Sequence, residues 1–183
     1  MDRKIIGIDM DDTLYDFVKP LLLLHNARFR VNIKESEITD YEIQKFLSPF
    51  CKNLFNEFAN EDFFEKIKIK KNNIESINNL QKTNKIYFVT AGAPKTAQYR
   101  HKLLQRTFSW YKHNNLIIIG NKKLLDIDYL IDDCPHYVAA CTRYLSILMS
   151  RPWNKNCLGE GFVRINSFKE FEKLQFTIRR KHG

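Results

Sequence analysis

Five aspartates follow short apolar segments of the sequence, in two groups. The first group is Asp9, Asp11 and Asp12, and the second is the pair Asp132 and Asp133. Carboxylates gathered at neutral pH repel one another unless a cation joins them, and oxygen ligands favour a hard ion such as Mg²⁺. A carboxylate can also attack phosphorus, while a second one two residues away protonates the leaving oxygen. The pattern therefore favours metal-assisted phosphoryl transfer.

A hydroxyl and an ammonium follow two further apolar segments. Thr90 ends the segment Ile86–Val89, and Lys122 comes shortly after Leu116–Ile119, with Lys123 as the alternative in register. One lysine together with a metal would neutralise the charge of a phosphate. Each residue has an ordinary structural interpretation as well, since aspartates often cap helices and most lysines lie on the surface. Their joint order on successive segments argues against that interpretation.

A parallel sheet is the element that would bring these residues together. Short β-branched segments alternate with longer segments of helical period, which is typical of an α/β fold with a Rossmann-like parallel sheet flanked by helices. The expected strands are Lys4–Asp9, Ile86–Thr90, Leu116–Ile119, Tyr129–Asp132, Leu145–Met149 and Phe162–Ile165. Ligands of open α/β sheets bind at the carboxyl ends of the strands, where the aspartates would meet the hydroxyl and the ammonium.

About eighty residues separate the first two expected strands, far more than one crossover helix needs. Helical patterns fill this stretch, including a helix expected over residues 14–30 and a second one capped by Thr39. We therefore expect an α/β core formed by residues 1–15 and 73–183. Residues 16–72 are expected to form a small helical cap inserted after the first strand and seated over its end.

The composition is basic, with 30 Lys and Arg against 21 Asp and Glu and a formal net charge of +9. Such a surface concentrates anions, including phosphorylated metabolites and nucleic acid, although a solvated lysine-rich face is the simpler interpretation. No apolar run is long enough to span a membrane, and aspartates stand where a signal peptide would be apolar. The four cysteines form no CxxC pair, which fits a reducing compartment. We expect a soluble, cytoplasmic protein without membrane contact.

At its candidate residues the sequence resembles the haloacid dehalogenase superfamily of phosphotransferases. The first motif of that superfamily, DxDx[TV], is similar to residues 9–13. The second motif, a Thr or Ser at a strand end, matches Thr90, and the third, a lysine, best matches Lys122. The fourth motif, an acidic pair, matches residues 132–133. The resemblance spans about residues 4–150 and follows the order of the motifs.

The resemblance implies a role for each matched carboxylate. Asp9 would be the nucleophile and also a metal ligand. Asp11 would be the general acid and base, and its backbone carbonyl would bind the metal. Asp132 and Asp133, one of them directly or through water, would complete a Mg²⁺ site. Dehalogenases of the superfamily lack the second aspartate of the first motif, so Asp11 argues for phosphoryl chemistry.

The resemblance also implies a phosphate-binding group formed by Thr90, Ala91 and Lys122. Two departures from the family pattern lie in this group. Ala91 stands where a second hydroxyl is often found, and Asn121 stands where an aspartate commonly precedes the lysine. These differences bear on the substrate and leave the reaction class unchanged.

Within the superfamily, the sequence is most similar to the 5′(3′)-deoxyribonucleotidases. The similar features are residues 8–14, the pair Phe63 and Phe64, and residues 128–133. This similarity implies hydrolysis of (deoxy)nucleoside monophosphates through an aspartyl-phosphate intermediate, beneath a helical cap whose aromatic residues stack on the base. Phe63 and Phe64 are the candidates for that stacking, with a place in the core of the cap as the alternative.

Other substrates and partners stay open at this point. The basic charge suits a phosphatase of the same superfamily that acts on another small phosphomonoester or on a nucleic-acid 3′-phosphate end. A polymer needs an open groove, however, whereas a cap of this length closes over a small molecule. A nucleoside monophosphate is therefore the expected substrate, nucleic acid is not favoured, and a homodimer is left open.

Overall fold

The computed structural model describes residues 3–138, 143–159 and 161–182. Within them, six parallel strands form one sheet in the order β3-β2-β1-β4-β5-β6. The strands are β1 Lys4–Asp9, β2 Asn84–Thr90, β3 Leu116–Ile118, β4 Tyr129–Asp132, β5 Leu145–Met149 and β6 Phe162–Ile165. The helices are α1 Val18–Phe29, α2 Leu54–Phe58, α3 Glu61–Lys66, α4 Lys71–Thr83, α5 Ala97–Thr107, α6 Pro135–Val138 and α7 Phe168–His182. The predicted α/β class and all the predicted strands are confirmed.

Alternation of side chains along the strands creates two apolar clusters, one for each face of the sheet. Ile8 and Phe88 belong to the larger cluster, which extends to buried residues of α4, α5 and α7. Val89 and Leu130 belong to the smaller cluster, together with Ile127. Since successive residues of a strand point to opposite faces, both faces of the central strands are covered. The sheet is thereby a rigid support for the residues at its carboxyl edge.

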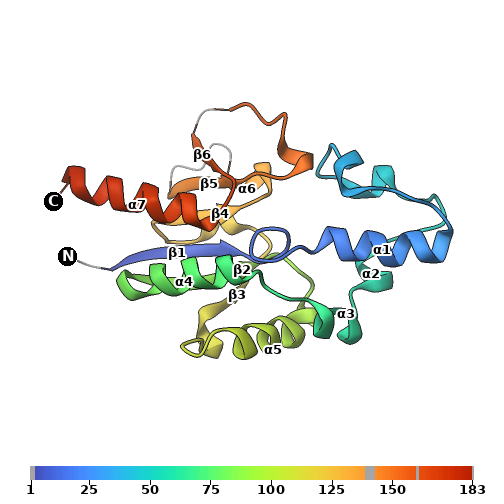
Figure 1. Ribbon diagram of the computed structural model, residues 1–183, viewed down its shortest axis with the longest axis horizontal. Helices are drawn as coiled ribbons and strands as arrows, with labels where there is room; N and C mark the ends of the chain where they lie inside the picture. The colour runs from blue at the N-terminus through green and yellow to red at the C-terminus, as the bar shows by residue number, and fades with distance from the viewer. Residues whose placement is uncertain (1–2, 139–142, 160, 183) are drawn as a thin grey trace.

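Helices α1, α2 and α3 lie beyond the carboxyl ends of the strands, in the segment between β1 and α4 (Figure 1). The predicted helix over residues 14–30 is shorter than expected, because Asp12 adopts a left-handed conformation with φ 59°. Its carboxylate accepts hydrogen bonds from the backbone N–H groups of Phe17 at 2.9 Å and Val18 at 3.1 Å, so the helix begins only there. The chain before it forms a tight loop at the end of β1.

The predicted helix with a Thr39 cap is wrong. The chain forms a short 3₁₀ turn over Ile43–Phe46 instead, and its N-cap residue, Glu42, makes no side-chain capping bond. The carboxylate of Asp40 accepts the backbone N–H of Glu42 at 2.9 Å and takes the place of the expected hydroxyl. This part of the insertion is therefore built from turns.

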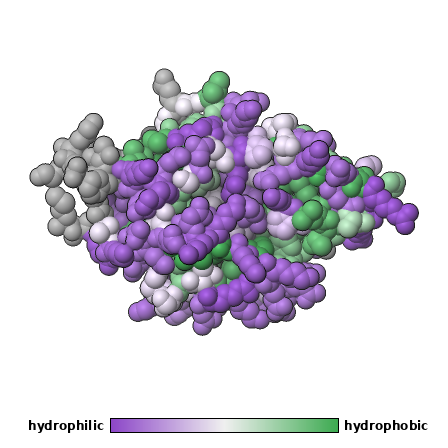
Figure 2. All heavy atoms as spheres, in the orientation of Figure 1, coloured by the Kyte–Doolittle hydropathy of each residue, from purple (hydrophilic) through white to green (hydrophobic). Residues whose placement is uncertain are grey.

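Hydrophilic residues cover most of the face seen in Figure 2, as expected of a chain with this many lysines and arginines. Apolar residues come to the surface mainly around the end that carries α1 (Figure 2), where Leu23 and Leu24 are exposed. Among the residues that the structure describes, no helix combines the length and the apolar character needed to cross a bilayer.

Candidate active site

Three carboxylates and one ammonium meet at the carboxyl edge of the sheet. Asp9 ends β1 and Asp132 ends the neighbouring strand β4. One carboxylate oxygen from each of these two residues and one from Asp133 all lie within 4.8 Å of one another. The Nζ atom of Lys122 donates to the carboxylate of Asp9 and, at 2.7 Å, to Oδ2 of Asp132. All of these side chains are buried. Lys123, the alternative in register, is only half-buried and lies outside this group.

Burial and mutual repulsion dominate the electrostatics of this group. Burial raises the pKa of Asp9 to about 8, although the Lys122 ammonium opposes the shift. Burial, together with the charges of Asp9 and Asp132, also raises the pKa of Asp133 well above its ordinary value. The pKa of Lys122 is raised too, because its two carboxylate partners outweigh the effect of burial, so the ammonium stays charged.

When all three carboxylates are ionised, one ammonium among them leaves a surplus of negative charge in a buried place, which is costly unless a cation offsets it. The donors are all oxygens, which favours a hard divalent ion over a soft one. Asp9, Asp132 and Asp133 therefore fit a divalent metal. The carboxylate of Asp11 lies outside this cluster, so a contact to the metal would use its backbone carbonyl, as the resemblance implies.

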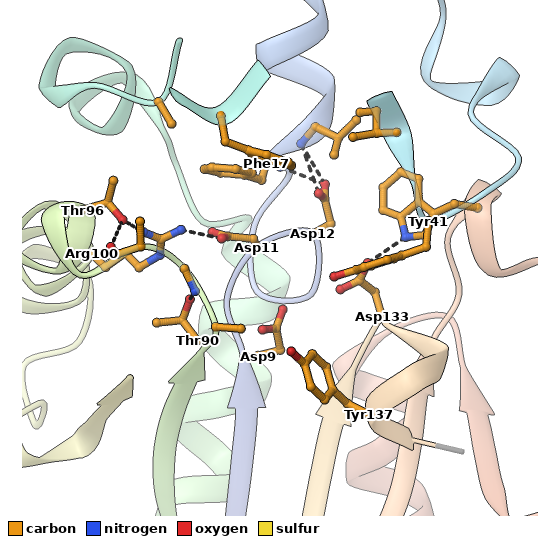
Figure 3. Close-up of a pocket in the computed structure, with 18 of the residues that line it drawn as sticks. Asp9, Asp11, Asp12, Phe17, Tyr41, Thr90, Thr96, Arg100, Asp133 and Tyr137 are labelled. Atoms are coloured by element: carbon orange, nitrogen blue, oxygen red, sulfur yellow. Dashed lines mark hydrogen bonds and ion pairs between the residues drawn. The ribbon is translucent and has the colours of Figure 1, made fainter. Parts of the chain in front are cut away.

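The carboxylate of Asp11 is held by two partners that the sequence did not suggest. Tyr15 donates its hydroxyl to Oδ1 at 2.6 Å. Arg100 forms an ion pair with Oδ2, as Figure 3 shows. Arg100 comes from α5 and is 3% exposed. A Cβ at Gly92 would lie 2.6 Å from its Nη2 atom, so the lack of a side chain there leaves room for the guanidinium in this position.

The predicted phosphate-binding residues line the same pocket as Asp9. Thr90 ends β2, and its Oγ1 atom accepts the backbone N–H of Gly92 at 2.9 Å. Ala91 is exposed beside it, and Lys122 reaches the pocket from the short turn that follows β3. The missing second hydroxyl leaves this edge of the pocket with only a methyl side chain at residue 91. The structure thus brings the hydroxyl and the ammonium together with the nucleophile candidate.

The pocket has a volume of about 330 Å³ and extends from the carboxylates into the segment between β1 and α4. At the sheet end it is lined by Asp9, Asp11, Asp133 and Thr90, and toward the insertion by Phe17 and Phe55 among others. Figure 3 shows Asp9, Asp11 and Asp133 around one space, with Tyr41 and Tyr137 beside them. A cavity of this size suits a small molecule.

Comparison with known proteins gives the family. Residues 3–182 match the family model described as 5′ nucleotidase, deoxy (pyrimidine), cytosolic type C protein. The chain belongs to this family. It is accordingly a phosphoric monoester hydrolase, and the predicted similarity to the 5′(3′)-deoxyribonucleotidases is confirmed.

Individual relatives agree with the family assignment. The chain is 25% identical to the 5′(3′)-deoxyribonucleotidase of Bacillus subtilis strain 168 over 173 residues, which cover 93% of this chain and 98% of the relative. Its fold is similar to that of a haloacid dehalogenase-like hydrolase from Streptococcus pneumoniae, with a TM-score of 0.65, 11% identity and coverage of 94% and 98%. The fold is also similar to that of the HAD-hydrolase YfnB of Bacillus subtilis, solved bound to magnesium, with a TM-score of 0.59 and 14% identity. The match covers 94% of this chain and 99% of that chain. At these identities the structural similarity shows the fold alone.

The aromatic pair that the resemblance to deoxyribonucleotidases singled out lies away from the lining of this pocket. Phe63 and Phe64 are buried, and both pack against Phe17 with ring centroids 5.2 and 5.8 Å away. The ring of Phe64 also lies 5.0 Å from the guanidinium carbon of Arg100. Their place in the core was the alternative considered, and the structure favours it over stacking on a base. Phe17 and Phe55 are the phenyl rings that face the cavity.

Proposed function

We propose that this protein is a magnesium-dependent phosphatase that hydrolyses (deoxy)nucleoside monophosphates through an aspartyl-phosphate on Asp9. The observation that carries the proposal is one pocket that joins the buried group of Asp9, Lys122 and Asp133 to an aromatic end. The family description and the name of the Bacillus subtilis relative support a nucleotide as the substrate. The volume of the cavity favours a mononucleotide over a polymer end.

The pocket divides into a phosphate end and a nucleoside end. The phosphate end comes from the segments 1–15 and 73–183, which we propose as the α/β core. The nucleoside end comes from residues 16–72, which we propose as the helical cap, since Phe17 and Phe55 belong to it. Apolar and aromatic walls with a few polar groups suit a base and a sugar.

Asp9, Asp132 and Asp133 would hold the magnesium ion, in keeping with their buried oxygen donors. When bound, the ion supplies positive charge that draws phosphoryl oxygens toward the carboxylates and neutralises the surplus negative charge. Lys122 supplies a second positive charge at the same place. Thr90, through its hydroxyl, and Ala91, through its backbone N–H, are the donors that complete the phosphate end.

In the first step a carboxylate oxygen of Asp9 attacks phosphorus, and the bond from phosphorus to the nucleoside oxygen breaks. Asp11 gives its proton to that oxygen, so the nucleoside leaves as an alcohol. In the second step water attacks the phosphorus of the aspartyl-phosphate, Asp11 takes a proton from the water, and the bond between phosphorus and Asp9 breaks. Tyr15 and Arg100 hold the carboxylate of Asp11 in place for both transfers.

Phosphate release from a panel of substrates tests the proposal. The panel contains deoxynucleoside, ribonucleoside and sugar monophosphates and an oligonucleotide with a 3′-phosphate, each assayed with magnesium and with EDTA. We expect release that requires magnesium and is fastest with deoxynucleoside monophosphates. Faster release from the sugar phosphates or from the oligonucleotide would contradict the substrate assignment. Equal release in EDTA would contradict the metal dependence.

A further inference from the structure

The carboxylate of Asp133 is held on both of its oxygens by neighbouring side chains. The hydroxyl of Thr13 donates to Oδ1 at 3.2 Å, and the indole Nε1–H of Trp153 donates to Oδ2 at 2.7 Å. Asp133 is 4% exposed, so water cannot readily replace these bonds. A buried carboxylate depends on such partners for its orientation as well as for its charge.

The indole itself is fixed by the turn in which it lies. This turn, residues 151–154, follows β5, and Trp153 is buried in it. The Nδ2 atom of Asn154 donates to the carbonyl of Asp133 at 2.8 Å and to that of Met149 at 2.7 Å. The Oδ1 atom of Asn154 accepts from Nη1 of Arg164 at 2.9 Å. The turn is therefore tied to β4, β5 and β6 at once, and the indole has little freedom to swing away from Asp133.

A third tie joins the turn to the loop after β1. The guanidinium of Arg151 donates to the backbone carbonyl of Asp12, and its Nη1 atom lies 3.7 Å from the carboxylate of Asp16. The turn thus bridges the two acidic motifs, one at the end of β1 and the other at the end of β4. Trp153 also forms part of the pocket lining, on the side of Asp133.

We propose that Trp153 is a positioning residue that orients the Asp133 carboxylate toward the divalent cation. The inference rests on the proposed function, which makes Asp133 a metal ligand. The indole N–H can only donate, and one donated bond leaves the carboxylate further lone pairs for a cation. Hydrogen-bond partners behind a ligand fix its orientation, and their loss typically weakens metal binding by roughly 10-fold to 100-fold.

Calorimetric titration with Mg²⁺ tests the role of the indole N–H. The variant Trp153→Phe removes the donor and keeps an aromatic ring in the turn. We expect its Kd for Mg²⁺ to rise by about 10-fold or more over that of the unaltered protein. Trp110→Phe is the matched control, because Trp110 donates its Nε1–H to Asn78 at 2.7 Å, away from the acidic cluster. Its Kd should stay unchanged.

Intrinsic fluorescence gives a second readout that does not depend on activity. The sequence contains two tryptophans, so Trp110→Phe leaves Trp153 as the single indole. Because that indole is bonded to a ligand, its emission should change as Mg²⁺ saturates the site. The emission of Trp110, observed alone in the Trp153→Phe protein, should not respond.

The outcomes separate the two proposals. If the unaltered protein binds no Mg²⁺, the proposed function fails along with this inference. If the unaltered protein and Trp153→Phe bind Mg²⁺ with equal affinity, only the inference is overturned. Should circular dichroism show that Trp153→Phe does not fold, the Trp110→Phe protein decides, because an emission that stays constant at saturating Mg²⁺ contradicts the proposed contact.

Discussion

Lys122 shows most clearly how single residues define the site. Its ammonium bonds to Asp9 and Asp132, which come from two different strands, and its side chain is only 2% exposed. A lysine is rarely buried to this extent unless it is paired. The energetic cost of burying the ammonium is offset by the two carboxylates, and the same charge is available to a phosphate that enters the pocket.

The pair of adjacent lysines allows a direct comparison. We predict that Lys122→Met lowers the rate of phosphate release by about 100-fold or more, because a charge that stabilises the phosphoryl group is lost. Its thermal midpoint should also fall, since carboxylates are left buried without their ammonium. Lys123→Met, in the half-buried neighbour, should change both quantities little. Phosphate release assays and thermal unfolding measure the effects, and equal losses in both variants would contradict the assignment.

The residues recovered from the sequence differ in kind from those that were missed. Asp9 and Lys122 follow strands, so their order along the chain predicts that they meet. Arg100 lies in α5, where an arginine has a structural explanation by default, and Trp153 lies in a turn after β5 to which the sequence pattern assigns no role. Their contacts with Asp11 and Asp133 depend on tertiary packing. Gly92 was the available sequence signal for the position of Arg100, because its lack of a side chain leaves room for the guanidinium.

At the scale of elements, Asp128 joins the starts of two neighbouring strands. Its carboxylate accepts the backbone N–H of Ile5 at 2.8 Å and the ammonium of Lys4 at 2.6 Å. Partial burial opposes the shift, but these two donors together hold the pKa of Asp128 below its ordinary value. The bonds therefore help to align β1 with β4, the two strands that end in Asp9 and Asp132.

We predict that Asp128→Asn lowers the thermal midpoint at pH 7 and that the difference from the unaltered protein shrinks in acid. The sign follows from the lowered pKa of Asp128 in the folded state. The stabilisation is present above the pKa of the unfolded chain, about 3.9, and is lost as the pH falls through the folded value. Thermal unfolding of both proteins from pH 7 to pH 3 measures it. A difference that is constant over this range would contradict the role of the charge.

Strands were easier to predict than the helices of the insertion. The apolar runs that became β1 and β4 are covered on both faces, so their composition alone marks them. The start of α1 was missed because Asp12 caps it from a left-handed conformation, which helical periodicity does not reveal. The turn over Ile43–Phe46 was missed because Asp40, and not Thr39, bonds to the backbone there. Hydrogen bonds from nearby aspartate side chains to the backbone therefore set where the helix α1 and the turn over Ile43–Phe46 begin.

For the whole molecule, the formal net charge is +9, although the candidate site itself is rich in carboxylates. A basic surface raises the local concentration of an anionic substrate and speeds its encounter with the pocket. Added salt screens charges beyond about 10 Å at roughly 0.1 M ionic strength. Salt should therefore weaken the long-range attraction of the substrate to the surface, which affects binding, more than the contacts within the site, which affect the chemical step.

We predict that kcat/KM for a deoxynucleoside monophosphate falls several-fold between about 0.01 M and 0.2 M salt, with kcat nearly unchanged. Steady-state kinetics at fixed pH and fixed Mg²⁺ measure both constants. A lower kcat with an unchanged KM would mean that salt acts on the site itself, and a kcat/KM independent of salt would exclude steering by the surface.

Nucleophilic attack by Asp9 on phosphorus can be tested by measuring phosphate release from the Asp9→Asn protein at saturating deoxynucleoside monophosphate and Mg²⁺. An amide cannot form the covalent intermediate, so we predict a loss of at least about 100-fold in a folded protein. Asp126→Asn, at an exposed aspartate, is the matched control and should release phosphate at the unaltered rate. Release at the unaltered rate by Asp9→Asn itself would contradict nucleophilic attack by Asp9.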